Sequence, residues 1–287
     1  MNSFFFFDFY MILWYNVDTF EGDTMGVKIV ESTRDFGVMN ANSRFYPMRY
    51  DAARREKEFM KHRTKLGEFY GFDPNKFFMA DQLDKSGTYF EITEEYVEDN
   101  PKGWSDIPED ILVISKDVPG VVIGHPVADC PVVMVSDSRR GVSAIGHCSC
   151  ELIDKRLPMM VADALVDAYG SYDEDLHIYV SACAGDDWIY QNYPRWAEDY
   201  NFWKDCIYEE DGIFKIDIRK ALSKQFNERN IKRENIVYNP ADTISDKNYY
   251  SNFASSPNGL GDKSKLGRHF AGLFYDNGYQ LTKSRKK

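Results

Sequence analysis

Short runs of β-branched residues alternate along the chain with stretches of helical periodicity. The densest group of apolar runs lies at 111–114, 121–123, 132–135 and 142–145. Uninterrupted apolar runs of this length are typical of strands that are buried on both faces. Similar but shorter runs predict further strands at 27–32, 77–80, 88–92, 178–182 and 236–238. Apolar residues at helical spacing predict helices over 51–70, 151–169 and 216–229.

This alternation predicts an α/β protein, more closely an α+β layered sandwich of mixed sheets flanked by helices. The stretch 93–108 is acidic and contains two prolines, so we expect a surface excursion there. No Gly, Ser or Pro linker divides the chain, which favours a single domain over 25–280. An apolar N-terminal extension (1–24) would precede this domain, and a basic tail (281–287) would follow it.

Composition narrows the classes of function. The 287 residues carry a formal net charge of −11, which argues against general nucleic-acid binding, because contact with phosphate backbones needs surplus Lys and Arg. The apolar stretch at 4–15 falls short of the roughly 20 residues that span a bilayer, so no membrane role is expected. The odd count of five cysteines favours a reduced, cytoplasmic protein. Four of them lie between 130 and 183, which favours thiol chemistry or a metal.

Two chemically capable side chains flank the predicted hairpin at 132–145. Cys130 precedes its first strand and His147 ends its second, so antiparallel pairing brings both residues to one edge of the sheet. A Cys beside a His serves as a thiolate nucleophile or supplies sulfur and nitrogen ligands to zinc. Alternatively, Cys130 is simply a small buried side chain and His147 a hydrogen-bonded residue at a strand end.

The motif Val-Ala-Asp-Cys-Pro-Val-Val at 127–133, followed by Ala-Ile-Gly-His at 144–147, resembles the signature of the laccase-domain family. These YfiH-like proteins were formerly called multicopper polyphenol oxidases and are now regarded as purine nucleoside phosphorylases. Weaker matches in the same order are Ser32-Thr33-Arg34, Asp217 at the head of a helix, and Gly267-Arg268. The resemblance runs from about residue 27 to about 275 and implies a fold shared with deamidating toxins of the cytotoxic necrotizing factor type.

The resemblance also implies a site. The family binds a metal, usually zinc, through a His-Cys-His set beside a nucleoside pocket. Cys130 and His147 match two of these ligands, and Asp84 stands where the family has its first histidine. Arg34, Ser251 and Arg268 are the residues expected to bind substrate or phosphate. The implied reaction is phosphorolysis of adenosine, inosine, guanosine or methylthioadenosine, and adenosine deamination is also described for the family.

Several positions depart from the family pattern. Glu151 replaces an arginine after His147, and the arginines of the family's late Phe-Ser-Tyr-Arg-Arg motif are missing around Ser251. His125, Cys148 or Cys150 would each compensate for the missing histidine as a metal ligand. Alternation along extended segments argues against all three, because neighbouring side chains face opposite ways.

Three hypotheses about function follow. The first is a zinc-dependent enzyme of the purine nucleoside phosphorylase type with a partly degraded site, using Cys130, His147 and Asp84. The second is a catalytically inactive family member that serves as a structural or interaction protein, as a homo-oligomer or with a protein partner. The third is a Cys-His hydrolase or deamidase, which requires only Cys130 and His147.

Overall fold

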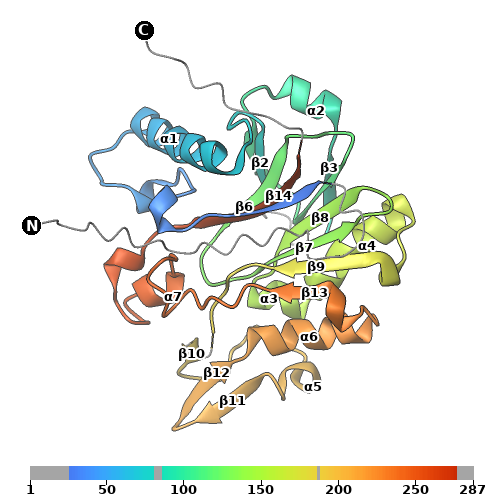
Figure 1. Cartoon of the computed structure of the whole chain (residues 1–287). Coiled ribbons are helices and arrows are strands. Elements are labelled where there is room, and N and C mark those ends of the chain that lie inside the picture. The colour runs from blue at the N-terminus through green and yellow to red at the C-terminus, as the bar shows by residue number, and fades with distance from the viewer. Residues whose placement is uncertain (1–25, 81–85, 186–187, 277–287) are drawn as a thin grey trace, which may run out of the picture.

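The computed structural model describes residues 26–80, 86–185 and 188–276 (Figure 1). The extension at 1–24, the tail at 281–287 and Asp84 therefore lie outside the described residues. The strands are β1 (Val27–Glu31), β2 (Phe77–Ala80), β3 (Tyr89–Ile92), β4 (Trp104–Ile107), β5 (Ile111–Ser115), β6 (Val122–Val127), β7 (Val132–Asp137), β8 (Val142–His147), β9 (Leu176–Val180), β10 (Ile189–Tyr190), β11 (Ile207–Glu210), β12 (Ile213–Ile216), β13 (Ile236–Tyr238) and β14 (His269–Tyr275).

The α-helices are α1 (Ala52–Tyr70), α2 (Glu94–Asp99), α3 (Cys150–Asp154), α4 (Leu157–Tyr169), α5 (Tyr200–Trp203), α6 (Ile218–Glu228) and α7 (Asn252–Ser255). Short 3₁₀ turns are η2 (Arg34–Phe36), η3 (Ser43–Phe45), η4 (Asp173–Asp175), η5 (Arg233–Asn235) and η6 (Lys263–Lys265). Among the described residues, no helix has the length and apolar character needed to cross a membrane.

The strands of the described residues form two large sheets and one small one. Sheet A has the order β1-β14-β6-β2-β4, and sheet B has the order β13-β9-β7-β8-β5-β3. A smaller sheet has the order β10-β12-β11. Both large sheets mix parallel and antiparallel neighbours, which confirms the predicted mixed-sheet α/β architecture.

Apolar side chains divide the molecule into layers. Helix α1 covers the outer face of sheet A, where Phe59 and Leu66 pack with Phe270 and Phe274. The inner faces of the two sheets meet in a second apolar layer, referred to below as the intersheet layer. Helices α3, α4 and α6 cover the outer face of sheet B, and their contact with it forms a third apolar layer (Figure 1). The order of layers is therefore helix, sheet, sheet, helix, as expected when each sheet must bury both faces.

The structure refines three of the predicted elements. Residues 93–103 lie at the surface, as predicted, but the segment 93–108 forms α2 and β4, β4 pairs in parallel with β2, and Ile107 is buried in the intersheet layer. The predicted helix 151–169 is two helices, because Arg156 takes a left-handed φ of 67° between α3 and α4. The strands predicted at 77–80 and 88–92 lie in different sheets, since β2 belongs to sheet A and β3 to sheet B.

Candidate functional site

The predicted hairpin places Cys130 and His147 at one end of sheet B. Strands β7 and β8 pair antiparallel with Val132 opposite His147, and the Cys148 amide donates to the Pro131 carbonyl at 2.8 Å. Both Cys130 and His147 are half-buried. The expected meeting of the two strand ends is therefore confirmed, and the site is built by the backbone register of one hairpin.

His125 approaches the same place from the other sheet. It lies on β6 between Ile123 and Val127, which both point into the intersheet layer, so alternation directs His125 into that layer as well. His147 shares a face with Ile145 and enters the same layer from sheet B. The His125 and His147 rings lie 6.0 Å apart between centroids, at 47°. The alternation argument fails for His125 because the two histidines belong to different sheets.

The His125 ring is fully buried, and neither of its nitrogens makes a hydrogen bond of good geometry with the described residues. Burial, followed by the neighbouring His147, lowers the pKa of His125 to about 3, against weak polar contacts with the backbone of Ala80 and Ile145. Burial, followed by the Arg268 guanidinium, lowers the pKa of His147 to about 4. Both rings are therefore neutral near pH 7, which is the form that binds metals.

Burial also governs the Cys130 thiol. Its pKa is raised to about 12, first by burial and then by the Asp129 carboxylate, while Arg268 acts in the opposite direction. A Cys-His hydrolase relies on a thiolate stabilised by an imidazolium. Neither the Cys130 thiolate nor the His147 imidazolium is favoured here, which argues against the hydrolase or deamidase hypothesis.

Asp129 holds the turn that presents Cys130, a role that the sequence analysis did not assign. Its backbone takes a left-handed φ of 80°, which is uncommon for a residue other than glycine. Its buried carboxylate accepts hydrogen bonds from Thr243 Oγ1 at 2.8 Å and from the Phe253 amide at 2.6 Å. The Asp129 carbonyl accepts from the Ala184 amide at 2.7 Å. The only signal in the sequence was the position of this residue within the Asp-Cys-Pro motif.

The residues expected to bind phosphate separate into three environments. Arg268 is half-buried and lies near enough to influence the pKa of both Cys130 and His147. Ser251 is fully buried and caps α7, because its Oγ accepts from the Ala254 amide at 2.9 Å. Arg34 donates to the Lys247 carbonyl at 3.0 Å and stacks over Tyr250. Of the three, Arg268 is the residue that the structure brings to Cys130 and His147.

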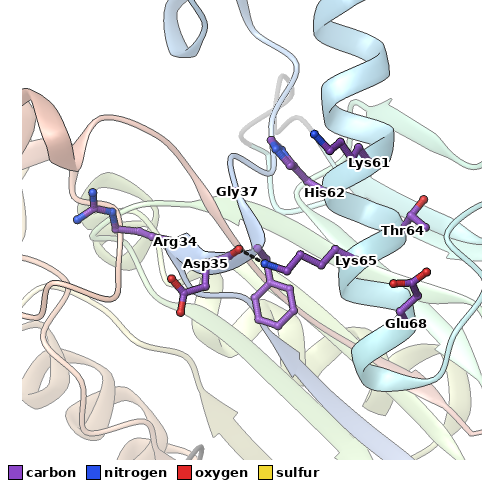
Figure 2. A pocket seen from close by; sticks show the side chains of 9 residues that line it. Arg34, Asp35, Gly37, Lys61, His62, Thr64, Lys65 and Glu68 are labelled. Carbon is purple, nitrogen blue, oxygen red and sulfur yellow. Dashed lines mark hydrogen bonds between the residues drawn. The ribbon is translucent and has the colours of Figure 1, made fainter. Parts of the chain in front are cut away.

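A surface cleft of about 570 Å³ lies between η2 and α1 (Figure 2). His62, Lys65 and Glu68 line its α1 side, and neither Cys130 nor His147 is among its lining residues. Arg34 extends away from α1 at its edge, whereas Lys65 reaches across to the Asp35 carbonyl. The cleft is thus separate from the histidine pair.

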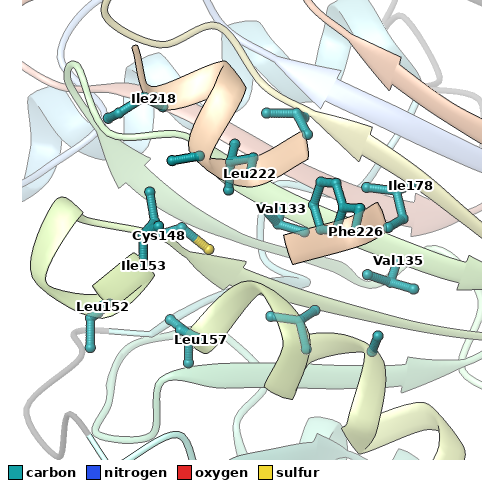
Figure 3. Close-up of a cluster of buried hydrophobic side chains, with 14 of the residues drawn as sticks. Val133, Val135, Cys148, Leu152, Ile153, Leu157, Ile178, Ile218, Leu222 and Phe226 are labelled. Carbon is teal, nitrogen blue, oxygen red and sulfur yellow. The ribbon is translucent and has the colours of Figure 1, made fainter. Parts of the chain in front are cut away.

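Cys148 and Cys150 lie on the helix side of sheet B. Cys148 is fully buried and directs its sulfur among the apolar side chains beneath α3 and α6, which include Val133 and Leu222 (Figure 3). Cys150 is 5% exposed and belongs to the same cluster. Glu151, at the position of the family's arginine, is exposed and pairs with Lys155 at 3.4 Å. These three side chains therefore pack or face solvent.

The described residues meet part of the requirement for a zinc site. Zinc takes at least three protein ligands, and a buried imidazole without a hydrogen-bond partner suits one of them. His125 fits this description, and His147 lies opposite it. Across residues 26–80, 86–185 and 188–276, however, no three His, Cys, Asp or Glu side chains are placed to hold one metal ion.

The layered fold is shared with solved structures of one class of α/β protein. YlmD from Geobacillus stearothermophilus superposes with a TM-score of 0.69 at 13% identity, covering 88% of this chain and 93% of that one. The hypothetical protein YfiH from Bacillus licheniformis superposes with a TM-score of 0.66 at 15% identity, covering 87% of this chain and 93% of that one. A Neisseria meningitidis protein of the DUF152 family superposes with a TM-score of 0.62 at 14% identity, covering 88% of this chain and 95% of that one.

The sequence itself identifies the family. Residues 28–274 match the family model described as multi-copper polyphenol oxidoreductase laccase. The chain therefore belongs to this laccase-domain, YfiH-like family, as the Asp-Cys-Pro and Gly-His motifs indicated. A search of curated proteins finds no match.

Proposed function

We propose that the chain is a metal-dependent enzyme that phosphorolyses purine nucleosides at the Cys130–His147 edge of the sandwich. The observation that carries this proposal is the His125–His147 pair, in which a fully buried imidazole faces a second imidazole across the two sheets and, within the described residues, makes no hydrogen bond of good geometry. Buried polar atoms without partners are costly, and they are retained most readily where a ligand satisfies them.

The donors that we assign to the metal are Cys130, His147 and Asp84, as expected from the sequence, together with His125. Because no three such side chains of the described residues are placed around one point, the proposal requires the Cys130 side chain to move toward the histidine pair when zinc binds. Sulfur and imidazole nitrogen are ligands that zinc accepts readily. A bound zinc would supply a Lewis acid that polarises an oxygen of the substrate.

Phosphorolysis also requires a cation for the phosphate. In this reaction a phosphate oxygen bonds to the C1′ carbon of the ribose, the bond from C1′ to the purine nitrogen breaks, and the purine takes up a proton. Arg268 supports the proposal, because its guanidinium lies near Cys130 and His147 and provides donors with fixed geometry. It would hold the phosphate while the Asp129 turn presents Cys130.

The test is an assay of purine release by the full chain. Adenosine, inosine, guanosine and methylthioadenosine are incubated with and without inorganic phosphate, and free base is measured by chromatography. We expect phosphate-dependent release that Cys130→Ala abolishes, together with zinc that copurifies with the wild type and is lost in the variant. Cys206→Ala, a buried cysteine at the start of the small sheet, is the matched control. Absence of base release from every nucleoside, with zinc added, would contradict the proposal.

A second candidate is a family member without catalytic activity that acts through protein contacts. It is favoured by the finding that the described residues assemble no set of three metal ligands, and by the exposed Glu151 at the position of an arginine. It predicts protein free of zinc, together with a stable oligomer or complex by size exclusion with light scattering.

A further inference from the structure

Two arginines from distant parts of the chain meet at one phenyl ring beside the candidate site. Arg44 lies on η3, and Arg268 immediately precedes β14. The guanidinium carbon of Arg44 lies 4.5 Å from the centroid of the Phe45 ring, and that of Arg268 lies 4.9 Å from it. The two cations are therefore no farther apart than the sum of these distances.

The backbone fixes both arginines in place. The amide of Met39, which is fully buried, donates to the Arg268 carbonyl at 2.8 Å, so the segment that leads to η3 is tied to the start of β14. Asn42 caps η3, because its Oδ1 accepts from the Arg44 amide at 3.1 Å. The pair is thus a product of ordered backbone on both sides.

The positive charge of the pair is not neutralised within the described residues. Arg268 donates to the Gly267 carbonyl at 2.8 Å and to Asn252 Oδ1 at 3.4 Å, and both acceptors are uncharged. Neither Arg44 nor Arg268 forms an ion pair in residues 26–80, 86–185 and 188–276. The nearby Asp129 carboxylate accepts from Thr243 and the Phe253 amide instead. Burial lowers the pKa of Arg268 to about 10, and the like charge of Arg44 contributes to this shift.

We propose that Arg44 and Arg268 together bind the phosphate co-substrate, with Arg44 as the outer residue and Arg268 as the inner one. Arg44 is exposed and would meet the anion from solvent, whereas Arg268 is half-buried and precedes His269, which pairs with Val127 three residues before Cys130. Two guanidinium groups offer a tetrahedral oxyanion several donors in fixed planes. The identity of the anion as phosphate rests on the proposed function.

This assignment gives a physical account of the missing family arginines. A cation at the position of Glu151 would come from α3, but that side chain is turned to solvent and paired with Lys155. The structure supplies positive charge from Arg44 on η3 instead. Phe45 keeps the two cations near each other, because each guanidinium gains a favourable contact with its ring.

The test measures binding of inorganic phosphate to the full-length protein by isothermal titration calorimetry, without nucleoside. We expect Arg44→Gln and Arg268→Gln each to weaken binding by about tenfold or more, because each removes charge-assisted hydrogen bonds. Arg268→Lys, which retains the positive charge, should lose less affinity for phosphate than Arg268→Gln does. The matched control is Arg49→Gln, which removes the same charge from an exposed position on the same segment and should bind phosphate as the wild type does.

Two results would overturn the inference: no phosphate binding by the wild type, or equal binding by Arg44→Gln and Arg49→Gln. Either failure is distinguishable from failure of the proposed function, because binding requires no turnover. Phosphate binding that depends on Arg44, without any purine release, would contradict the proposed reaction and leave the phosphate site supported. Purine release by Arg44→Gln with an unchanged KM for phosphate would contradict the role of Arg44 and leave the proposed reaction supported.

Discussion

The two ends of the intersheet layer both contain polar side chains, yet they differ in how these are satisfied. At one end the Ser143 hydroxyl lies 2.9 Å from the Ser136 hydroxyl and 2.9 Å from the Tyr275 hydroxyl, so the three hydroxyls are linked by hydrogen bonds through Ser143. At the other end His125 and His269 are fully buried, and neither makes a hydrogen bond of good geometry with any residue that the structure describes. Strand β14 contributes to both ends, beginning at His269 and finishing at Tyr275.

The contrast distinguishes structural from functional polarity within one layer. A satisfied hydroxyl chain stabilises the packing of two sheets and needs nothing further. Buried imidazoles without partners destabilise the fold, and such departures are expected at functional sites. Since the same strands build both ends, general flexibility or poor packing does not explain the difference. Three substitutions test this comparison, and they are given in order of decreasing expected effect.

The largest effect is expected from His125→Phe. Replacing the imidazole by a ring of similar shape removes a metal donor, so we expect purine release to fall by roughly a hundredfold. In the metal-free protein the same change removes two buried nitrogens that lack good hydrogen bonds within the described residues, so the free energy of unfolding should rise by about 1 kcal/mol. Chromatographic assays and urea unfolding measure the two effects.

The control for this substitution is His177→Phe, in a half-buried histidine of β9. It should leave purine release unchanged. Equal activity of His125→Phe and the wild type would show that the imidazole pair has no part in the reaction.

The second prediction concerns acid stability and His269. Burial, followed by the charges of Arg268 and Lys265, lowers the pKa of His269 to about 3, and the Tyr249 ring packs edge-on against it at 5.2 Å between centroids. Below about pH 6.5 the unfolded chain binds a proton that the folded chain excludes, so the stability is complete above that pH and declines as the pH falls toward 3. At pH 5 this single group should reduce the free energy of unfolding by about 2 kcal/mol.

His269→Gln removes this titration. The loss of stability between pH 7 and pH 5, measured by urea unfolding, should therefore be smaller by about 2 kcal/mol than in the wild type. His62→Gln, at a half-buried position on α1, should retain the wild-type pH dependence. An identical decline in all three proteins would show that His269 is not held neutral by its surroundings.

The smallest effect is expected at the satisfied end. Tyr275→Phe removes the hydroxyl that bonds to Ser143, and we expect the free energy of unfolding to fall by about 1 kcal/mol. Purine release should stay at the wild-type rate, because this end of the layer lies at the far end of β14 from the site. A loss of activity comparable to that of His125→Phe would erase the distinction between the two ends.

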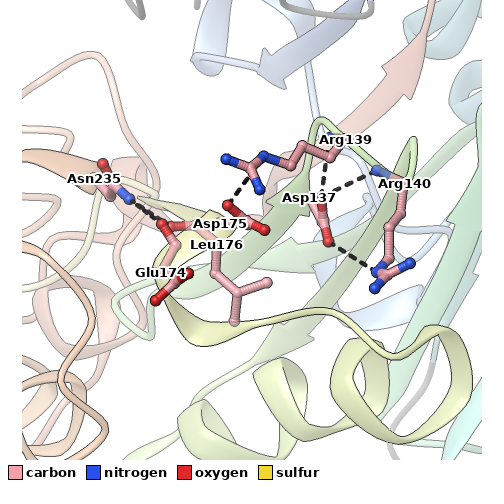
Figure 4. Close-up of polar contacts among 7 residues, drawn as sticks. All are labelled: Asp137, Arg139, Arg140, Glu174, Asp175, Leu176 and Asn235. Atoms are coloured by element: carbon pink, nitrogen blue, oxygen red, sulfur yellow. Dashed lines mark hydrogen bonds and ion pairs between the residues drawn. The ribbon is translucent and has the colours of Figure 1, made fainter.

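Local signals explain why the hairpin was predictable. The sequence Asp-Ser-Arg-Arg-Gly at 137–141 predicts a turn, and in the structure the Asp137 carboxylate accepts from the amides of Arg139 and Arg140 at 2.9 and 3.1 Å (Figure 4). Arg139 also pairs with Asp175 at 3.2 Å, which joins this turn to the start of β9. Turn residues and apolar runs act over a few positions, so the hairpin and its register follow from neighbouring residues.

The errors arise where tertiary contacts override such signals. Residues 104–107 appear polar and proline-flanked, yet they form β4 because β2 offers a free edge beside them. The break at Arg156 is set by the need of α3 and α4 each to cover sheet B. Strands β2 and β4 are not adjacent in the sequence, so no local pattern predicts their pairing.

The amino-acid sequence by itself determined the mixed α/β layers, the family, and the hairpin that brings the strand ends beside Cys130 and at His147 together. Each of these depends on patterns or hydrogen-bond registers within a short stretch of chain. Only the tertiary structure decided that His125 faces His147 and that Arg44 joins Arg268 at Phe45. Those pairs form across two stacked sheets or between segments more than two hundred residues apart, where the packing of whole layers, rather than local periodicity, determines which side chains meet.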